Sequence, residues 1–206
     1  YRTNAQSRSI EEALRKQNIP YKIYGGLSFY QRKEIKDVLA YCRLTINPND
    51  EEALKRIINY PGRGIGNTTI QKLIITSNNS NISVWELITN LDKYDHKINK
   101  GTCSKIEEFA TLIKSFISQK ENQDAYFLAE HIAKSSGLFN DLYNDKSPEG
   151  VSRFENIQEL LNGLKDFCEN NEENLLANYM RDVALLTNQD NEKKEDFNKV
   201  TLMTVH

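Results

Sequence analysis

The residues best suited to chemistry lie in one stretch that has no acidic side chains. Between positions 53 and 85 the sequence contains no Asp or Glu, although the chain of 206 residues has 29 acidic and 27 basic residues and a net charge of −2. Four basic residues lie in this window: Lys55, Arg56, Arg63 and Lys72. Because a local excess of positive charge attracts polyanions, the window predicts a phosphate-binding surface on a chain that is not basic as a whole.

A glycine-containing turn in the middle of this window strengthens the prediction. Gly64-Ile65-Gly66 leads into a run typical of a helix, where Thr68 and Thr69 add two hydroxyl donors. Unpaired backbone N–H groups at a helix start, together with the positive end of the helix dipole, bind phosphate oxygens. Ile65 would anchor the turn inward, as in helix-hairpin-helix proteins, so that the loop contacts phosphates and not bases. The alternative is that both glycines only permit a tight turn between helices.

Other kinds of catalytic site find little support in the sequence. His96 and His131 are not at ligand spacing from another histidine or cysteine, and we expect them to be solvated or packed. Cys42, Cys103 and Cys168 form no CxxC pair, which argues against a disulfide framework or a zinc site and favours a reducing compartment. Neither GxSxG nor the phosphate loop GxxxxGKS or GxxxxGKT is present. We therefore expect no catalytic residue, metal or cofactor in this chain.

The elements that position the loop are expected to be helices, because apolar residues recur at three- and four-residue spacing along most of the chain. The predicted fold class is mainly α: an irregular multi-helix array with short strands at both ends. No apolar run reaches the ~18 residues of a membrane span, so we expect a cytoplasmic protein. Residues 189–199 have no apolar periodicity and are expected to be mobile. Helices are expected near 7–17, 31–46, 50–59, 67–76, 84–88, 106–116, 125–134, 154–167 and 175–186. Ser7 or Ser9 is expected to cap the first of them.

Both ends of the chain suggest strands that need a neighbouring domain. The sequence begins at Tyr1 and stops at His206, just after the apolar, β-branched run from Val200 to Val205. Such a run predicts a buried strand, and a lone terminal strand needs partners. A second short strand is expected over 21–24, ahead of a Gly-Gly turn. We interpret the chain as a domain insert whose ends are short pieces of the neighbouring domain.

Several motifs follow one another in a recognisable order. The first four are Tyr1-Arg-Thr-Asn-Ala-Gln-Ser-Arg8, Ile19-Pro-Tyr-Lys-Ile-Tyr-Gly-Gly26, Phe29-Tyr-Gln-Arg-Lys-Glu-Ile-Lys-Asp37 and Arg63-Gly-Ile-Gly66. Further along come Lys134-Ser-Ser-Gly137, Ser152-Arg-Phe-Glu-Asn156 and Val200-Thr-Leu-Met-Thr-Val-His206. Together they resemble the UvrD, PcrA and Rep group of superfamily 1 DNA helicases over essentially the whole chain.

The resemblance implies a division of the chain into parts. Residues 1–18 would be a strand and helix at the edge of motor domain 2A. Residues 19–198 would form the helical 2B subdomain, with helix-hairpin-helix-type elements, and 199–206 a strand returning to 2A. By the same resemblance, three residues in the 2A pieces line the single-stranded DNA track: Arg2, Asn4 and His206. The duplex-gripping loop would consist of Arg63, Gly64, Ile65, Gly66, Thr68, Thr69 and Lys72.

What the resemblance implies about activity belongs to a longer parent protein. The parent would be an ATP-dependent 3′ to 5′ DNA helicase that unwinds duplex DNA, using ATP and Mg bound outside this chain. Its partners would be DNA, both single strand and duplex junction, the remaining motor domains, and repair or replication proteins. A rival interpretation is that this subdomain is a protein-interaction or autoinhibitory module of the same helicase.

Two groups of residues near the start of the chain have open roles. Tyr24, Phe29 and Tyr30 could stack on bases, but aromatics beside a Gly-Gly turn more commonly fill an interface, so we expect core packing. Three charged residues that follow them are expected to form structural ion pairs: Arg32, Glu34 and Asp37.

Overall fold

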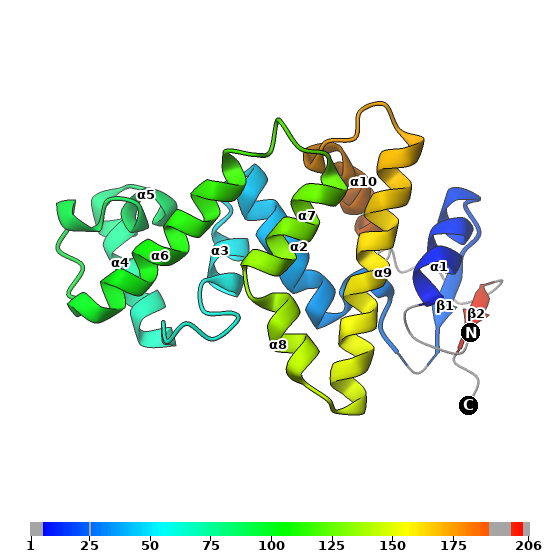
Figure 1. Cartoon of the computed structure of the whole chain (residues 1–206), viewed down its shortest axis with the longest axis horizontal. Coiled ribbons are helices and arrows are strands. Elements are labelled where there is room, and N and C mark those ends of the chain that lie inside the picture. Colours follow the sequence, from blue (N-terminus) through cyan, green and yellow to red (C-terminus); the bar gives the residue numbers. More distant parts are fainter. Residues whose placement is uncertain (1–5, 25, 190–198, 204–206) are drawn as a thin grey trace.

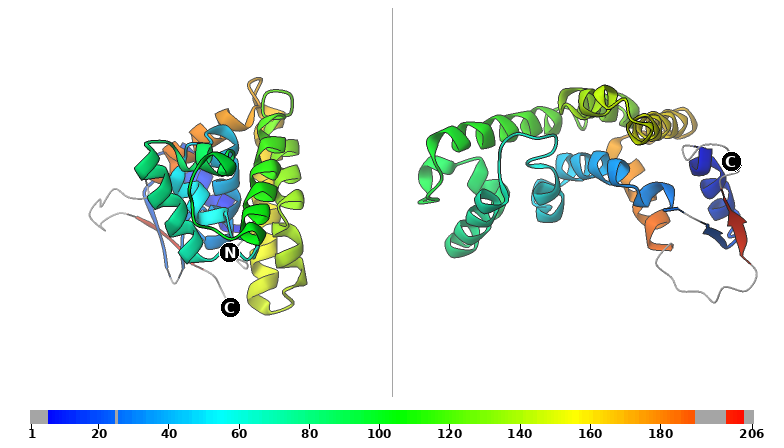
Figure 2. Two further views of the ribbon diagram at one scale, coloured as in Figure 1. Left: turned by 90° about the vertical axis from the view of Figure 1, so that its left-hand side faces the viewer. Right: turned by 90° about the horizontal axis from the view of Figure 1, so that it is seen from below.

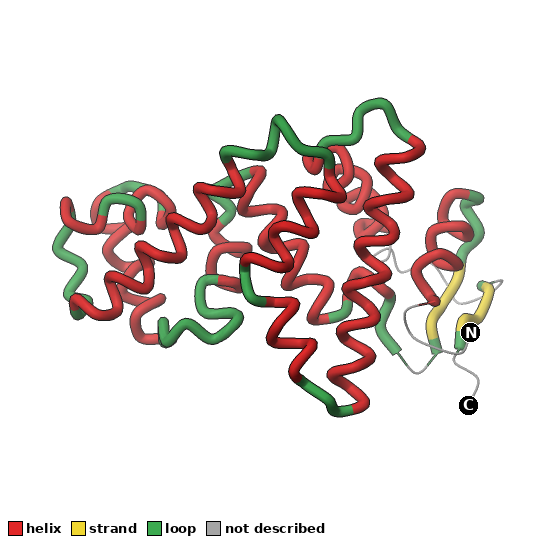
Figure 3. Tube along the Cα trace, in the orientation of Figure 1, coloured by secondary structure: helices red, strands yellow, loops and turns green. Residues whose placement is uncertain are grey.

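A computed structural model describes residues 6–24, 26–189 and 199–203, and it is mainly helical, as predicted (Figures 1 and 3). The α-helices are α1 (Ser7–Lys16), α2 (Lys33–Ile46), α3 (Glu51–Ile57), α4 (Asn67–Ser80), α5 (Val84–Ile88), α6 (Lys100–Ile117), α7 (Ala125–Ser135), α8 (Leu138–Asn144), α9 (Pro148–Asn170) and α10 (Leu176–Gln189). Two 3-10 turns, η2 (Phe29–Gln31) and η3 (Leu91–Lys93), and two strands, β1 (Tyr21–Ile23) and β2 (Val200–Leu202), complete the described elements. Residues 190–198, which were expected to be mobile, lie outside the described residues.

The two strands come from opposite ends of the chain and pair with each other. β1 and β2 run parallel, with Tyr21 opposite Val200 and Ile23 opposite Leu202. They lie beside α1 at one end of the molecule, and the helical array extends away from them (Figure 1). The prediction of short strands near both ends is therefore confirmed. The two pieces could not have been paired from sequence, because register between distant strands depends on tertiary packing.

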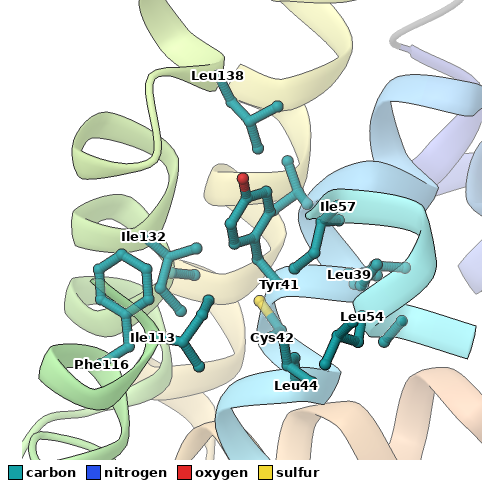
Figure 4. Packing of buried hydrophobic residues seen from close by; sticks show 14 of the residues in the cluster. Leu39, Tyr41, Cys42, Leu44, Leu54, Ile57, Ile113, Phe116, Ile132 and Leu138 are labelled. Atoms are coloured by element: carbon teal, nitrogen blue, oxygen red, sulfur yellow. The ribbon is translucent and has the colours of Figure 1, made fainter. Parts of the chain in front are cut away.

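Helix α2 is the centre of the array. It packs against α3, α6, α7, α9 and α10. Viewed from below, α6 and α9 lie in one layer, whereas α4, α3, α2 and α10 form another (Figure 2). Tyr41 and Cys42 of α2 are 0% and 1% exposed and lie between these layers (Figure 4). A helix buried on several sides explains why the apolar pattern of α2 is wider than a single stripe.

Side-chain caps explain where several helices begin. The carboxylate of Asp50 accepts a hydrogen bond of 2.9 Å from the N–H of Ala53, and the hydroxyl of Ser83 accepts one of 3.1 Å from Glu86. Such caps satisfy backbone donors that the helix itself leaves unpaired. Both positions agree with the predicted helix starts. The same bond is made by Asn99 at α6, Asp124 at α7 and Ser147 at α9.

Some sequence predictions about the helices were wrong. Ser7 or Ser9 was expected to cap α1, but Gln6 occupies the N-cap position, and the Ser7 hydroxyl instead accepts a hydrogen bond of 2.8 Å from Arg32. The Ser7 hydroxyl, which could have capped the helix, is therefore used in a hydrogen bond to a distant residue. Helix α8 was not expected, and α9 begins at Pro148, well before the predicted start. Short helices contain too few turns for an apolar period to be visible.

The first segment of the chain is joined to the helical array by charged groups. The guanidinium of Arg8 in α1 is 2.9 Å from Glu159 and 3.3 Å from Asp166, both in α9, and 3.0 Å from Glu12. Arg8 lies over Gly163 of α9, where an added Cβ would come within 2.5 Å of the guanidinium. The close approach of α1 to α9 therefore depends on a residue without a side chain.

The residues with open roles near the chain start divide between core and surface. Phe29 and Tyr30 are 0% and 2% exposed, which confirms the prediction of core packing for these two. Tyr24 is 71% exposed, so the same prediction was wrong for it. The prediction of a structural ion pair is confirmed for Asp37, which pairs with Arg56. Arg32 and Glu34 are instead linked through a neutral amide, because Arg32 donates to Asn156, which donates to Glu34.

Candidate nucleic-acid interface

The loop between α3 and α4 is organised from inside by one amide side chain. The Oδ1 atom of Asn59 accepts hydrogen bonds from the backbone N–H groups of Arg63, at 3.0 Å, and Ile65, at 2.9 Å. The side chain of Ile65 is fully buried, as expected for the inward anchor of the hairpin. Asn59 therefore bonds two N–H groups of the loop and leaves the N–H group of Gly64 between them unused. No pattern in the sequence indicates this role for Asn59.

Several backbone donors of this loop make no hydrogen bond within the described chain. The N–H groups of Gly64, Gly66, Asn67 and Thr68 donate no hydrogen bond to any part of the chain that the structure describes. Gly66 is the N-cap residue of α4, and no atom lies within 4 Å of the place where its Cβ would be. Free donors beside open space, at the positive end of a 14-residue helix, provide a place for a phosphate oxygen.

Gly64 has a different environment from Gly66. Its φ of +73° lies in the left-handed region, which favours glycine. A Cβ added there would also come within 2.6 Å of the Nζ atom of Lys105, in α6. Lys105 is exposed and forms no ion pair with any residue in the described ranges. Its ammonium group is therefore placed beside the loop and available to an anion, a feature that the sequence analysis missed.

Arg63 is used inside the protein. Its guanidinium donates to the carbonyls of Ile57, Pro61 and Ser136 and, at 2.7 Å, to the hydroxyl of Tyr41. It also lies over the ring of Phe109. These contacts connect the loop to α2, α6 and the turn between α7 and α8. Arg63 is therefore placed to hold the conformation of the loop.

The remaining basic residues of the acid-free window differ in their availability. Lys55 forms an ion pair with Glu51, in the same helix, and Arg56 forms one with Asp37 of α2; both carboxylates precede the window in sequence. Lys72 is exposed on α4, and its Nζ donates 2.8 Å to the carbonyl of Lys97. The acid-free window is thus less positive in space than in sequence, because carboxylates outside it fold back onto two of its cations.

Other predicted site residues occupy various positions. Thr68 is exposed and Thr69 half-buried, both in the first turn of α4. Arg2, Asn4 and His206 lie outside the described residues. His96 is 3.8 Å from Cys103, but no group of three potential metal ligands occurs among the residues described. None of the described helices is long and apolar enough to cross a membrane.

The helical fold and its loop agree with the protein family that the whole sequence matches. The chain belongs to the family described as the UvrD-like helicase C-terminal domain, whose sequence profile matches residues 1–206. It is 38% identical over 208 residues to proteins named ATP-dependent DNA helicase PcrA in Staphylococcus epidermidis and Staphylococcus aureus. These alignments cover 100% of this chain but only 28% of each relative. The chain thus corresponds to part of a DNA helicase, and it spans less than a third of these relatives.

Proposed function

We propose that this chain is the duplex-binding and regulatory 2B subdomain of an ATP-dependent DNA helicase, with edges of motor domain 2A at both ends. We assign residues 1–18 and 199–206 to 2A and 19–198 to 2B. The pairing of β1 with β2 beside α1 supports a 2A edge built from both ends of the chain, and this edge would also include β1, which spans Tyr21–Ile23. Parallel pairing of distant segments is typical of a chain that leaves one domain and returns to it.

The observation that carries the DNA-binding role is the closeness of two kinds of donor. The N–H groups of Gly64 and Gly66 donate no hydrogen bond within the described chain, and the ammonium of Lys105 lies beside Gly64 in the same loop. A phosphate placed there receives hydrogen bonds and a nearby positive charge together. Thr68, at the start of α4, adds a hydroxyl donor. None of these groups reads a base edge, so binding is independent of sequence.

The motor function belongs to the parent protein. ATP and Mg would bind to its other domains, because this sequence contains no phosphate loop. Hydrolysis would drive 3′ to 5′ movement along single-stranded DNA while this subdomain holds the duplex ahead of the junction. The parent would act in the cytoplasm, in DNA repair or replication, together with proteins of those processes. ATP hydrolysis by this chain alone should not exceed background.

Fluorescence anisotropy with a labelled DNA duplex tests the DNA-binding role. We expect binding at low salt that weakens steeply as salt is added, because phosphate contacts release counterions. Gly66→Ala places a methyl group in the open space beside the free donors, so it should weaken binding about ten-fold, or ~1.4 kcal/mol. Gly26→Ala, beyond β1 at the other end of the molecule, is the matched control and should bind like the unaltered chain.

Lys105→Ala isolates the contribution of the ammonium group. It should lower the slope of log affinity against log salt concentration by about one. Lys114→Ala is the control, because nine residues along α6 correspond to about half a turn round the helix, so Lys114 lies on the far side from the loop. Absence of duplex binding by the unaltered chain, or equal affinities for Gly66→Ala and Gly26→Ala, contradicts the proposal.

A further inference from the structure

A groove between α2 and α10 has no part in the proposed DNA-binding loop. Its volume is about 520 Å³, within the ~300–1,000 Å³ typical of ligand pockets. Lys36, Leu39, Ala40 and Arg43 of α2 form one wall, and Ala177, Met180, Arg181 and Ala184 of α10 form the other. In both helices these residues follow the spacing i, i+3, i+4 and i+7. Two complete helix faces are therefore turned toward one groove.

Two helix faces side by side favour a helix as the occupant. Side chains at this spacing form ridges, and a third helix packs its own ridges into the channel between them. The floor is apolar, with Ala40 and Val183 2% and 4% exposed. The small side chains of Ala177 and Ala184 let a backbone approach α10 closely. The apolar face of an amphipathic helix fits such a surface.

The charged residues around the groove indicate the sign of the charge that an occupant would carry. Four of its lining residues are basic and two are acidic. Arg43 is bonded to both acidic residues, Asp50 and Glu52, and Arg56 is paired with Asp37. Lys36 and Arg181, on opposite walls, are exposed and make no ion pair with any residue for which the structure gives a position. Among the residues that the structure describes, the uncompensated charge of the groove is therefore positive on both walls.

We propose that this groove binds an amphipathic, acidic helix of a partner protein. The apolar face of that helix would contact Ala40, Met180 and Val183, while carboxylates on its flanks would approach Lys36 and Arg181. This inference does not depend on the DNA-binding loop. It adds to a nucleic-acid surface at α4 and α6 a protein-docking surface on other helices of the array.

A labelled peptide tests the proposal directly. The probe is a fluorescein-labelled helical peptide with Leu at three- and four-residue spacing and Glu and Ala elsewhere, and its comparison peptide has Lys in place of Glu. We expect the acidic peptide to bind the chain and the basic peptide to bind at least about ten-fold more weakly, because opposite charges favour and like charges oppose docking. Equal binding of both peptides, or binding of neither, overturns the proposal.

Two variants locate the binding site. Lys36→Glu with Arg181→Glu should reduce acidic-peptide affinity at least about ten-fold, and Ala177→Trp, which fills the groove from an exposed position, should do the same without changing the thermal unfolding temperature. The matched control is Lys93→Glu with Lys114→Glu, which makes the same charge change on exposed lysines elsewhere. If the control pair weakens the peptide equally, the site lies elsewhere and the proposal fails. The proposal also fails if Lys36→Glu with Arg181→Glu abolishes duplex DNA binding while peptide affinity is unchanged.

Discussion

The guanidinium of Arg63 donates a 3.0 Å hydrogen bond to the backbone carbonyl of Ser136, 73 residues further along the chain. This bond ties the loop between α3 and α4 to the turn between α7 and α8. The two loops also touch where a Cβ on Gly137 would lie 3.7 Å from the ring of Pro61. The conformation of the candidate DNA-binding loop is therefore set partly by a second helical hairpin.

Replacing Arg63 by lysine should show whether the loop depends on the hydrogen bonds of Arg63 or only on its positive charge. Arg63→Lys keeps the positive charge but cannot reproduce the fork of hydrogen bonds, so we expect a loss of about 2–4 kcal/mol in unfolding free energy. Denaturant unfolding followed by circular dichroism measures this loss. Lys72→Arg, on the exposed side of α4, is the control. A variant as stable as the original chain would show that the internal bonds of Arg63 do not hold the loop.

Asn59→Ala should loosen the loop without changing any charge. The substitution leaves the N–H groups of Arg63 and Ile65 without their acceptor, which costs about 1–3 kcal/mol. Hydrogen exchange should become faster at these two amides, and duplex affinity should fall because the outer donors are no longer fixed. Asn79→Ala, at an exposed position of α4, should change neither quantity. Unchanged exchange at Ile65 would contradict the role given to Asn59.

The two glycines of the loop should respond differently to alanine. Gly64→Ala forces a side chain into a backbone with φ of +73° and against Lys105, so it should destabilise the chain by about 1–2 kcal/mol. Gly66→Ala meets neither obstacle and should change stability by less than about 1 kcal/mol. Thermal unfolding of both variants under one set of conditions makes the comparison. Equal destabilisation would contradict the different environments of the two positions.

The contact between α1 and α9 should depend on Arg8 and Gly163. Arg8→Met removes a guanidinium that is only 6% exposed and leaves Glu159 and Glu12 facing each other, so we expect a loss of about 3 kcal/mol. Gly163→Ala should also destabilise the chain, because its methyl group displaces Arg8. Gly101→Ala, at an exposed position of α6, should be neutral or stabilising, since alanine favours helix. Native-state hydrogen exchange should show the loss first in α1. If Gly163→Ala is as stable as Gly101→Ala, the contact between α1 and α9 does not require a glycine at position 163.

Tyr41 should make the chain sensitive to alkaline pH. Burial raises the pKa of Tyr41 from an ordinary 10.0 to about 12, although Arg63 acts in the opposite direction. Because the folded state holds this proton more tightly than the unfolded state, the stabilisation is complete below pH 10 and is lost as the pH rises through 12. The loss amounts to about 2–3 kcal/mol. Tyr41→Phe lacks this ionisation. Between pH 8 and pH 12 the variant should therefore lose less unfolding free energy than the unaltered chain loses. Parallel pH profiles for the two proteins would contradict this prediction.

Local features of the sequence were sufficient to predict most helices and the loop between α3 and α4. Apolar spacing, together with capping and turn residues, predicted nine of the ten helices described. The residues before α3 and α5 marked their starts, because capping involves only neighbours along the chain. The buried Ile65 between two glycines was likewise visible as a local pattern. The motifs were enough to predict the family, because they occur in order over the whole chain.

Contacts between distant segments decided the rest. Only the folded chain brings Lys105 to Gly64, Arg63 to Ser136, and the carboxylate of Asp37 to Arg56. The groove between α2 and α10 also arises from packing, since each helix face by itself reads as an ordinary amphipathic stripe. Helical periodicity determines which face of a helix is buried, but it carries no information about which other helix covers that face. The sequence therefore determined the helices, the loop and the family, whereas the tertiary structure decided which charges remain free to bind a ligand.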